Sequence, residues 1–200
     1  MSTGVESDAD PSPTPVAATR KLHHHLIEWA LLLLVALGLT FGMRAYVFQT
    51  YFIPSASMEP TLQVGDRIIV DKLAADLGTI HRGDILVFTS PPNEDCTGIH
   101  DPVLVKRVIG VPGDSLYSIG NTIYVNGKAL KEAWPHFEPL GPPAVATKSH
   151  PVVVGANHYF MMGDNHSDSC DSRMWGTVPK SDIIGKAFVR IWPVRRIGFL

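Results

Sequence analysis

The sequence lacks the features that mark several large classes of protein. It has only two cysteines in 200 residues and no CxxC pair, which excludes a disulfide-dense scaffold and a zinc ribbon. Its formal net charge is −2, and no tract interleaves basic and aromatic residues, so nothing indicates a nucleic-acid partner. No long amphipathic helix is evident after the first fifty residues. What remains is one domain of ordinary size with appendages, long enough to bury a core.

Short apolar, β-branched runs are abundant in the rest of the chain, and Gly, Pro, Asn or Asp separate most of them. The runs are DRIIVDKL, GDILVF, VLVKRVIGV, NTIYVNG, HPVVV, HYFMMG and IIGKAFVRIW. Within them, IYVNGK indicates a hairpin that turns at Asn126 and Gly127. The pattern predicts a mainly β, antiparallel body over residues 49–200, with a loop or hairpin insertion at about 113–155.

The first residues read MSTGVESDADPSPTPVAAT, a mixture of Pro, Ser, Thr and acids without aromatics. Such a stretch buries too little apolar surface to offset the entropy lost on ordering. We therefore expect residues 1–25 to form a disordered tail.

An apolar segment follows, and its 14 residues from Ala30 to Met43 carry no charge. That length alone fits a cleaved signal sequence, a buried core helix or a membrane span. Residues 26–48 as a helix would rise about 35 Å, enough to cross a bilayer with some tilt. Glu28 and Arg44 would then lie near the two interfaces, where charge is tolerated best. The bulky MRAYVFQTYFIP that follows argues against a signal cleavage site, so we expect a transmembrane anchor at 26–48.

The orientation of the anchor follows from its flanking charges. Arg20 and Lys21 precede the span and favour a cytoplasmic N-terminus, although Arg44 on the far side weakens the bias. The body would then be extracytoplasmic.

Directly after this segment the chain reads PSASMEPT, with Ser55 and Ser57 between Pro54 and Pro60. A serine hydroxyl attacks only when a base removes its proton. The chain has nine histidines, none in a pattern that singles one out, so a Ser-His-Asp triad stays open at this point. The simpler interpretation is an ordinary loop hydroxyl.

A lysine is the other available base. In VLVKRVIGV as a strand, Lys106 shares one face with Leu104 and Val108, and Arg107 lies on the other. Whichever face is buried carries one of the two cations into an apolar setting. Burial lowers the pKa of a lysine, which a lysine base requires, whereas arginine stays protonated. The alternation alone leaves Lys106 and Arg107 as alternatives.

The stretch GDNHSDSCDSRMWG, residues 163–176, is rich in Asp, Ser and Asn and predicts an irregular loop. It lacks the sixth-position glycine and final glutamate of an EF-hand calcium loop. It could equally hold a hydrogen-bonded network that braces a catalytic group.

Taken together, the motifs resemble the bacterial type I signal peptidases, which belong to the serine/lysine proteases. The matching blocks occur in order: IPSASMEPTLQVGD, RGDILVF, VKRVIGVPGD and MGDNHSDSCDSRMWGTVP. With the apolar segment before them, they span nearly all of residues 30–195.

The resemblance implies a role for each matching residue. Ser57 would be the nucleophile, Lys106 the general base, and Ser55 would help to form the oxyanion hole. Ser169 would orient the lysine amine. The same loop would be braced by Asp171, Arg173, Asp164 and Asn165, which take no part in proton transfer.

The sequence departs from the family pattern at two positions. Ala56 stands where glycine is usual, and alanine is strained there only if the backbone needs a positive φ. His166 stands where arginine is usual, and a neutral histidine cannot reproduce a bidentate bridge, so we expect a weaker or pH-dependent brace. Cys96 and Cys170 would be free to form a disulfide in an extracytoplasmic location.

The resemblance also implies partners and location. The substrates would be preproteins whose signal peptides carry small residues before the cut, bound as an extended strand, with no metal or organic cofactor. The enzyme would be a single-pass protein of the bacterial cell membrane, in contact with the lipid bilayer. Two alternatives remain: a self-cleaving repressor-type serine/lysine protease, which should carry a DNA-binding unit, and a catalytically inactive anchored β module that binds extended peptides.

Overall fold

The computed structural model describes residues 15–94 and 101–200, with side chains left out at 15–24, 26, 43–46 and 75–76. The chain divides into two compact units, Met1–Met43 and Arg44–Leu200.

The first unit contains most of helix α1, Pro15–Tyr46. This helix begins before residue 26, where we expected the anchor to start, and it includes residues 15–25 of the predicted tail. Proline fits the first position of a helix, and the Ala-rich turn after it favours helix continuation. The rest of the predicted tail, residues 1–14, lies outside the described residues. Within the described part of the chain, no helix is both long enough and apolar enough to cross a membrane.

The second unit is built on a large antiparallel sheet, which confirms the mainly β prediction. Its strands run in the order β1-β2-β11-β3-β4-β9-β10, with β12 paired to β11. Every ladder in it is antiparallel. The strand bounds are β1 Phe48–Phe52, β2 Arg67–Asp71, β3 Ile85–Thr89, β4 Val103–Gly110, β9 His158–Met162, β10 Val178–Pro179, β11 Ile183–Trp192 and β12 Gly198–Phe199.

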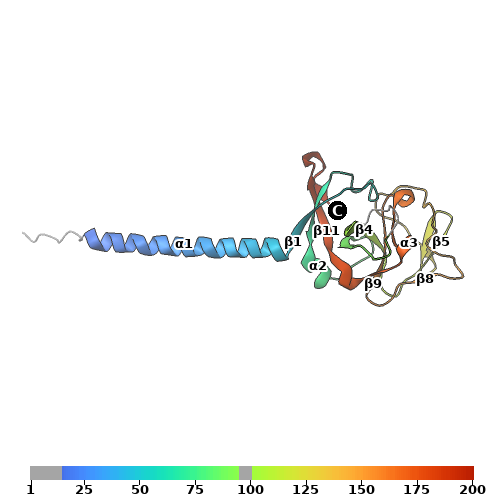
Figure 1. The fold of residues 1–200 in the computed structure, drawn as a ribbon, viewed down its shortest axis with the longest axis horizontal. Coiled ribbons are helices and arrows are strands. Elements are labelled where there is room, and N and C mark those ends of the chain that lie inside the picture. Colours follow the sequence, from blue (N-terminus) through green and yellow to red (C-terminus); the bar gives the residue numbers. More distant parts are fainter. Residues whose placement is uncertain (1–14, 95–100) are drawn as a thin grey trace, which may run out of the picture. The chain divides into compact units, whose positions relative to one another are not determined.

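A second, four-stranded sheet occupies much of the region predicted as an insertion. It contains β5 Ser115–Ile119, β6 Thr122–Val125, β7 Lys128–Ala129 and β8 Val152–Val153, in the order β7-β6-β5-β8. The predicted hairpin is confirmed, since Asn126 (φ 52°) and Gly127 (φ 77°) join β6 to β7. Both residues have positive φ, as a two-residue type I′ turn requires. Within the body, β5 and β8 lie at the opposite end from β1 (Figure 1).

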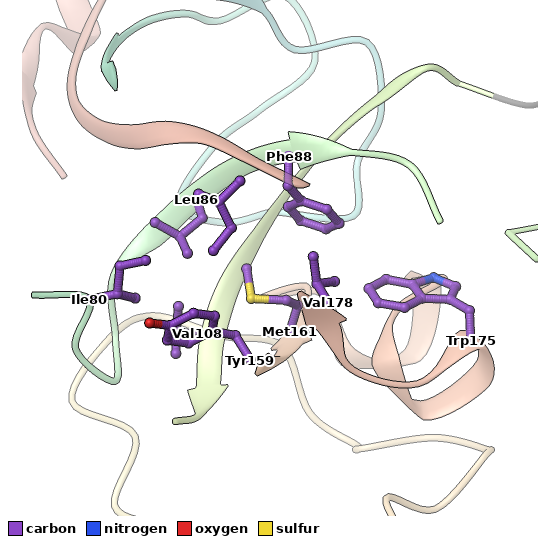
Figure 2. Packing of buried hydrophobic residues seen from close by; sticks show 9 residues of the cluster. Ile80, Leu86, Phe88, Val108, Tyr159, Met161, Trp175 and Val178 are labelled. Carbon is purple, nitrogen blue, oxygen red and sulfur yellow. The ribbon is translucent and has the colours of Figure 1, made fainter. Parts of the chain in front are cut away.

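The remaining helices are short: α2 Lys72–Asp76, α3 Ser172–Trp175, and the 3-10 turns η1 His166–Asp168, η2 Lys180–Asp182 and η3 Val194–Arg196. One hydrophobic cluster joins α3 to the large sheet (Figure 2). In it, the ring of Trp175 lies 6.0 Å from that of Phe88, beside Val178 and Met161. This packing fixes the end of the irregular loop 163–176 against the sheet.

Candidate active site

The PSASMEPT segment forms the connection between β1 and β2. Two backbone hydrogen bonds close the base of this loop: Ile53 N–H donates to Asp66 O, and Gly65 N–H donates to Ile53 O, each at 2.9 Å. Met58 and Leu62 are 1% and 0% exposed and anchor the loop in a hydrophobic cluster. Buried apolar residues on both sides of the serine pair therefore hold it at the rim of the sheet.

The structure brings Ser57 and Ser169 together around the amine of Lys106, with Ser55 beside Ser57. Lys106 Nζ lies 2.8 Å from Ser57 Oγ and 3.1 Å from Ser169 Oγ. Ser55 Oγ lies 3.4 Å from Ser57 Oγ. These residues come from β4 and from two loops far apart in the sequence. Lys106 therefore places a basic group within hydrogen-bond reach of the Ser57 hydroxyl.

The side chain of Lys106 is almost completely buried, with 3% of its surface exposed, and this burial changes its pKa. Desolvation lowers the pKa of Lys106 from 10.5 to about 8, although the negative charge of Asp171 opposes the shift. A lysine with this pKa has a substantial neutral fraction near pH 8 and can accept a proton.

Arg107 is buried as well, at 5% exposure, so both faces of β4 are covered and the sheet buries two cations. Arg107 Nε and Nη2 donate to the two carboxylate oxygens of Asp164 at 2.7 and 2.6 Å, and Nη1 donates to Gly83 O at 2.7 Å. In this bidentate pair the carboxylate of Asp164 neutralises the positive charge of Arg107. Arg107 is thereby fixed as a structural cation, while Lys106 has two hydroxyls as neighbours.

Asp171 and Arg173 form a second buried bidentate pair, both contacts at 2.8 Å. Arg173 also donates to Leu140 O at 2.6 Å and to His166 O at 2.7 Å. The pair therefore ties the loop that carries Ser169 to the segment before it and to the region of the second sheet. Nothing in the sequence singled out Leu140, because the acceptor is its backbone carbonyl.

Asn165 and Gly163 of the MGDN stretch both lie against the β1–β2 loop that carries Ser57. The Asn165 N–H donates to Ser57 O at 3.1 Å, and Asn165 Nδ2 donates to Ala56 O at 3.3 Å. Gly163 has no space for a side chain, since a Cβ there would overlap Ser57 O and the Ser169 hydroxyl. Sequence reasoning did not assign Gly163 a role; the glycine before Asp164 was visible, but the reason for it is a close approach of three chain segments.

The open question about Ala56 has a clear answer. Among the described residues, only Asn126 and Asn157 combine a side chain with a positive φ. Ala56 therefore occupies ordinary backbone space and carries no strain of the left-handed kind.

Cys170 is disulfide-bonded. Cys96, the other member of the predicted bridge, lies outside the described residues, so the pairing itself stays a prediction.

Two cavities flank Ser57, and Ser55, Ser57 and Lys106 line both. The smaller, about 140 Å³, extends toward β1 and the first residues of β4, with Ile53 and Val105 in its wall. The larger, about 360 Å³, extends toward the loop that carries Ser169. In the part of the chain that the structure describes, no group of three or more His, Cys, Asp or Glu residues is arranged to hold a metal ion.

A serine hydroxyl in contact with a buried lysine amine of lowered pKa is the arrangement of a serine hydrolase that uses lysine as its base. Comparison with known proteins agrees with this class. The family model described as "Signal peptidase, peptidase S26" matches residues 26–192.

Curated relatives extend the match. The chain is 40% identical to a probable signal peptidase I-2 of Synechocystis, covering 87% of this chain and 77% of that protein. It is 36% identical to a signal peptidase I of Leptolyngbya laminosa, covering 95% and 91%. It is also 36% identical to a signal peptidase I of Bacillus caldolyticus, covering 82% and 91%. The chain therefore belongs to the signal peptidase family, peptidase S26, and is a serine endopeptidase.

Proposed function

We propose that this chain removes N-terminal signal peptides from exported preproteins, with Ser57 as nucleophile and Lys106 as general base. The observation that carries the proposal is the 2.8 Å contact between Ser57 Oγ and the buried Lys106 Nζ.

The first step is acylation. Neutral Lys106 takes the proton of the Ser57 hydroxyl while Oγ attacks the scissile carbonyl carbon. The Ser55 hydroxyl and the Ser57 N–H donate to the carbonyl oxygen as it becomes an oxyanion. Ser169 keeps the lysine amine pointed at Ser57.

The second step releases the mature protein and then regenerates the enzyme. Protonated Lys106 gives its proton to the leaving amine as the peptide bond breaks, which leaves the signal peptide as an ester on Ser57. Lys106 next takes a proton from water, whose oxygen attacks the ester carbonyl. The proton returns to Ser57 Oγ as the ester bond breaks.

The strand pairing supports an extended substrate. Residues Val103–Lys106 of β4 pair with β3 along one edge, whereas the described ladder with β9 begins only at Arg107. An unpaired stretch of strand beside the nucleophile suits β-strand addition of a peptide. The 140 Å³ cavity next to it suits small side chains before the cut.

We also propose that residues 26–48, most of which lie in α1, anchor the enzyme in the cell membrane, with the N-terminus cytoplasmic and the body extracytoplasmic. Large apolar side chains from Leu31 to Leu34 are 59–71% exposed, and the segment from Ala30 to Met43 has no charge. A helix that is apolar on all sides is stable in lipid and unfavourable in water.

The test uses the full-length enzyme and a preprotein substrate. Ser57→Ala and Lys106→Met should each abolish cleavage, while the exposed controls Ser181→Ala and Lys128→Met should cleave at the wild-type rate. Cleavage by either active-site variant would overturn the mechanism. A wild-type protein that binds the preprotein without cutting it would instead favour the inactive peptide-binding module.

A further inference from the structure

Two histidines and two glutamates meet beside the catalytic loop. His166 is 2% exposed, its Nε2 lies 3.4 Å from Glu132 Oε2, and its ring stacks on His136 at a centroid distance of 5.1 Å. His136 also approaches Glu138, Nε2 to Oε1, at 3.4 Å. None of these four residues lines either cavity beside Ser57.

His166 and Glu132 carry buried polar atoms that form no hydrogen bond within the described part of the chain. Both ring nitrogens of His166 and Oε2 of Glu132 are buried without a hydrogen-bond partner among the described residues. Such groups are rare because each loses its hydration without compensation. His166 Nε2 and Glu132 Oε2 lie 3.4 Å apart, so an N–H at Nε2 is placed to donate to this carboxylate if the two groups approach further.

The segment that carries this cluster is joined to the nucleophile loop by a short chain of contacts. Phe137 N–H donates to Asp164 O at 2.8 Å, and the Trp134 ring packs on Arg107 at 5.0 Å. Asn165 directly follows Asp164 in the chain, and its backbone N–H donates to Ser57 O. His166 is therefore one residue away from the contact that fixes the backbone of Ser57.

We propose that the His166–Glu132 pair positions the nucleophile loop, and that the pair tightens when His166 is protonated. The inference rests on the proposed function, because its effect is a change in the rate of that reaction. An imidazolium and a carboxylate form a charge-assisted bond, whereas neutral imidazole gives an ordinary hydrogen bond. His166 acts as a positioning residue through Asn165 and touches neither substrate nor reacting atoms.

Three other charged or titratable side chains lie near His166: Arg173, Asp168 and His136. Arg173 of α3 donates to His166 O but is neutralised by Asp171, and Asp168 on the same turn is exposed. His136 competes for Glu132, with its Nδ1 at 3.8 Å from Oε2.

The pKa of His136 is raised. Burial opposes its protonation, but the Trp134 carbonyl, Glu132 and Glu138 outweigh burial. The carboxylate of Glu132 therefore faces two titratable rings, and any measured titration belongs to this cluster as a unit.

The experiment measures kcat and KM for the full-length wild type, His166→Gln and His166→Arg from about pH 5.5 to about pH 9, where histidine changes charge. The ratio of variant to wild-type kcat removes the titration of Lys106, which all three proteins share. For His166→Gln the ratio should fall roughly five- to tenfold on the acidic side and approach one on the alkaline side. For His166→Arg, which keeps its charge, the ratio should rise with pH. KM should stay within about twofold, since the pair does not line the substrate cavities.

Matched controls separate this effect from general damage. His150→Gln changes an exposed histidine and should give a flat ratio of one. Glu132→Gln removes the same pair from its other side and should reproduce the His166→Gln profile; it decides the matter if the His166 variants do not fold. A pH-independent ratio for all folded pair variants, or a change in KM alone, would overturn the inference. Failure of the proposed function is distinct, because it shows as cleavage by the Ser57 or Lys106 variant.

Discussion

At the scale of single residues, the proposed chemistry depends on the protonation state of Lys106. The amine lies between two serine hydroxyls and is almost completely desolvated. At a given pH, a larger fraction of it is therefore neutral than for a lysine in water. Arg107, its neighbour in the strand, is held as a cation by Asp164. Two adjacent basic residues therefore differ in charge state: burial favours the neutral form of Lys106, whereas Asp164 keeps Arg107 a cation.

The first prediction concerns the pH dependence of catalysis. Because only neutral Lys106 can accept the serine proton, kcat/KM should rise about tenfold per pH unit on the acidic side and level off above its pKa of about 8. A pH profile on a peptide substrate measures this. An inflection near 6.5, the ordinary value for histidine, would point to a histidine base instead.

The second prediction concerns the pH dependence of stability. The pKa of Lys106 is about 8 when folded and 10.5 ordinarily, so between these values the unfolded chain binds more protons. Burying the ammonium therefore destabilises the wild type fully below pH 8, and the penalty disappears as pH rises toward 10.5.

Lys106→Met should consequently be more stable than wild type by up to about 3 kcal/mol near neutral pH, with the difference shrinking at alkaline pH. Urea unfolding at several pH values measures it, with Lys128→Met as the exposed control. A gain that does not change with pH would contradict this origin.

At the scale of elements, the end of β4 is the point where the two sheets meet. Gly110 lies at a register irregularity in the pairing with β9. A Cβ there would come within 2.5 Å of Leu116 in the second sheet and 3.0 Å of Phe160 and Val154. The glycine thus permits close packing between the sheet that carries Lys106 and the region that carries Leu140, a partner of Arg173.

Gly110→Ala should therefore destabilise the body by about 1–3 kcal/mol, because the core has no room for the added methyl. Gly198→Ala is the matched control, since nothing lies within 4 Å of a Cβ at that position. Equal urea midpoints for the two variants would show that the junction adapts without loss.

At the scale of the whole molecule, the chain combines a long helix with an independently packed body. The unit Arg44–Leu200 contains both sheets and the whole candidate site. All described residues of the candidate site belong to this unit, so the proposed anchor and the proposed chemistry should be separable.

Deleting residues 1–43 should leave a protein that unfolds cooperatively and cleaves a short peptide at close to the full-length rate. It should lose most of its association with lipid vesicles in a flotation assay, because the apolar residues of 26–48 supply most of the buried area in lipid. Undiminished flotation would show that the body itself binds lipid.

Local patterns predicted the elements that depend on neighbours in the chain. The β-branched runs correspond to β2, β3, β4, β6, β8, β9 and β11, and the Asn-Gly turn joins β6 to β7 as expected. Alternation and turn chemistry suffice there because they act over a few residues. The helix over residues 15–25 was not predicted, since composition indicates disorder without excluding a helix that extends from an apolar segment.

Contacts between distant segments could not be predicted in this way. The sequence by itself determined seven of the strands, the hairpin and, through its ordered motifs, the resemblance that singled out Ser57, Lys106 and Ser169. Only the tertiary structure decided that Arg107 is neutralised by Asp164 and that Gly163 makes room for the Ser57 loop. Only it placed His166 against Glu132. These features depend on burial and on distances between segments up to a hundred residues apart, quantities that exist only once the chain has folded.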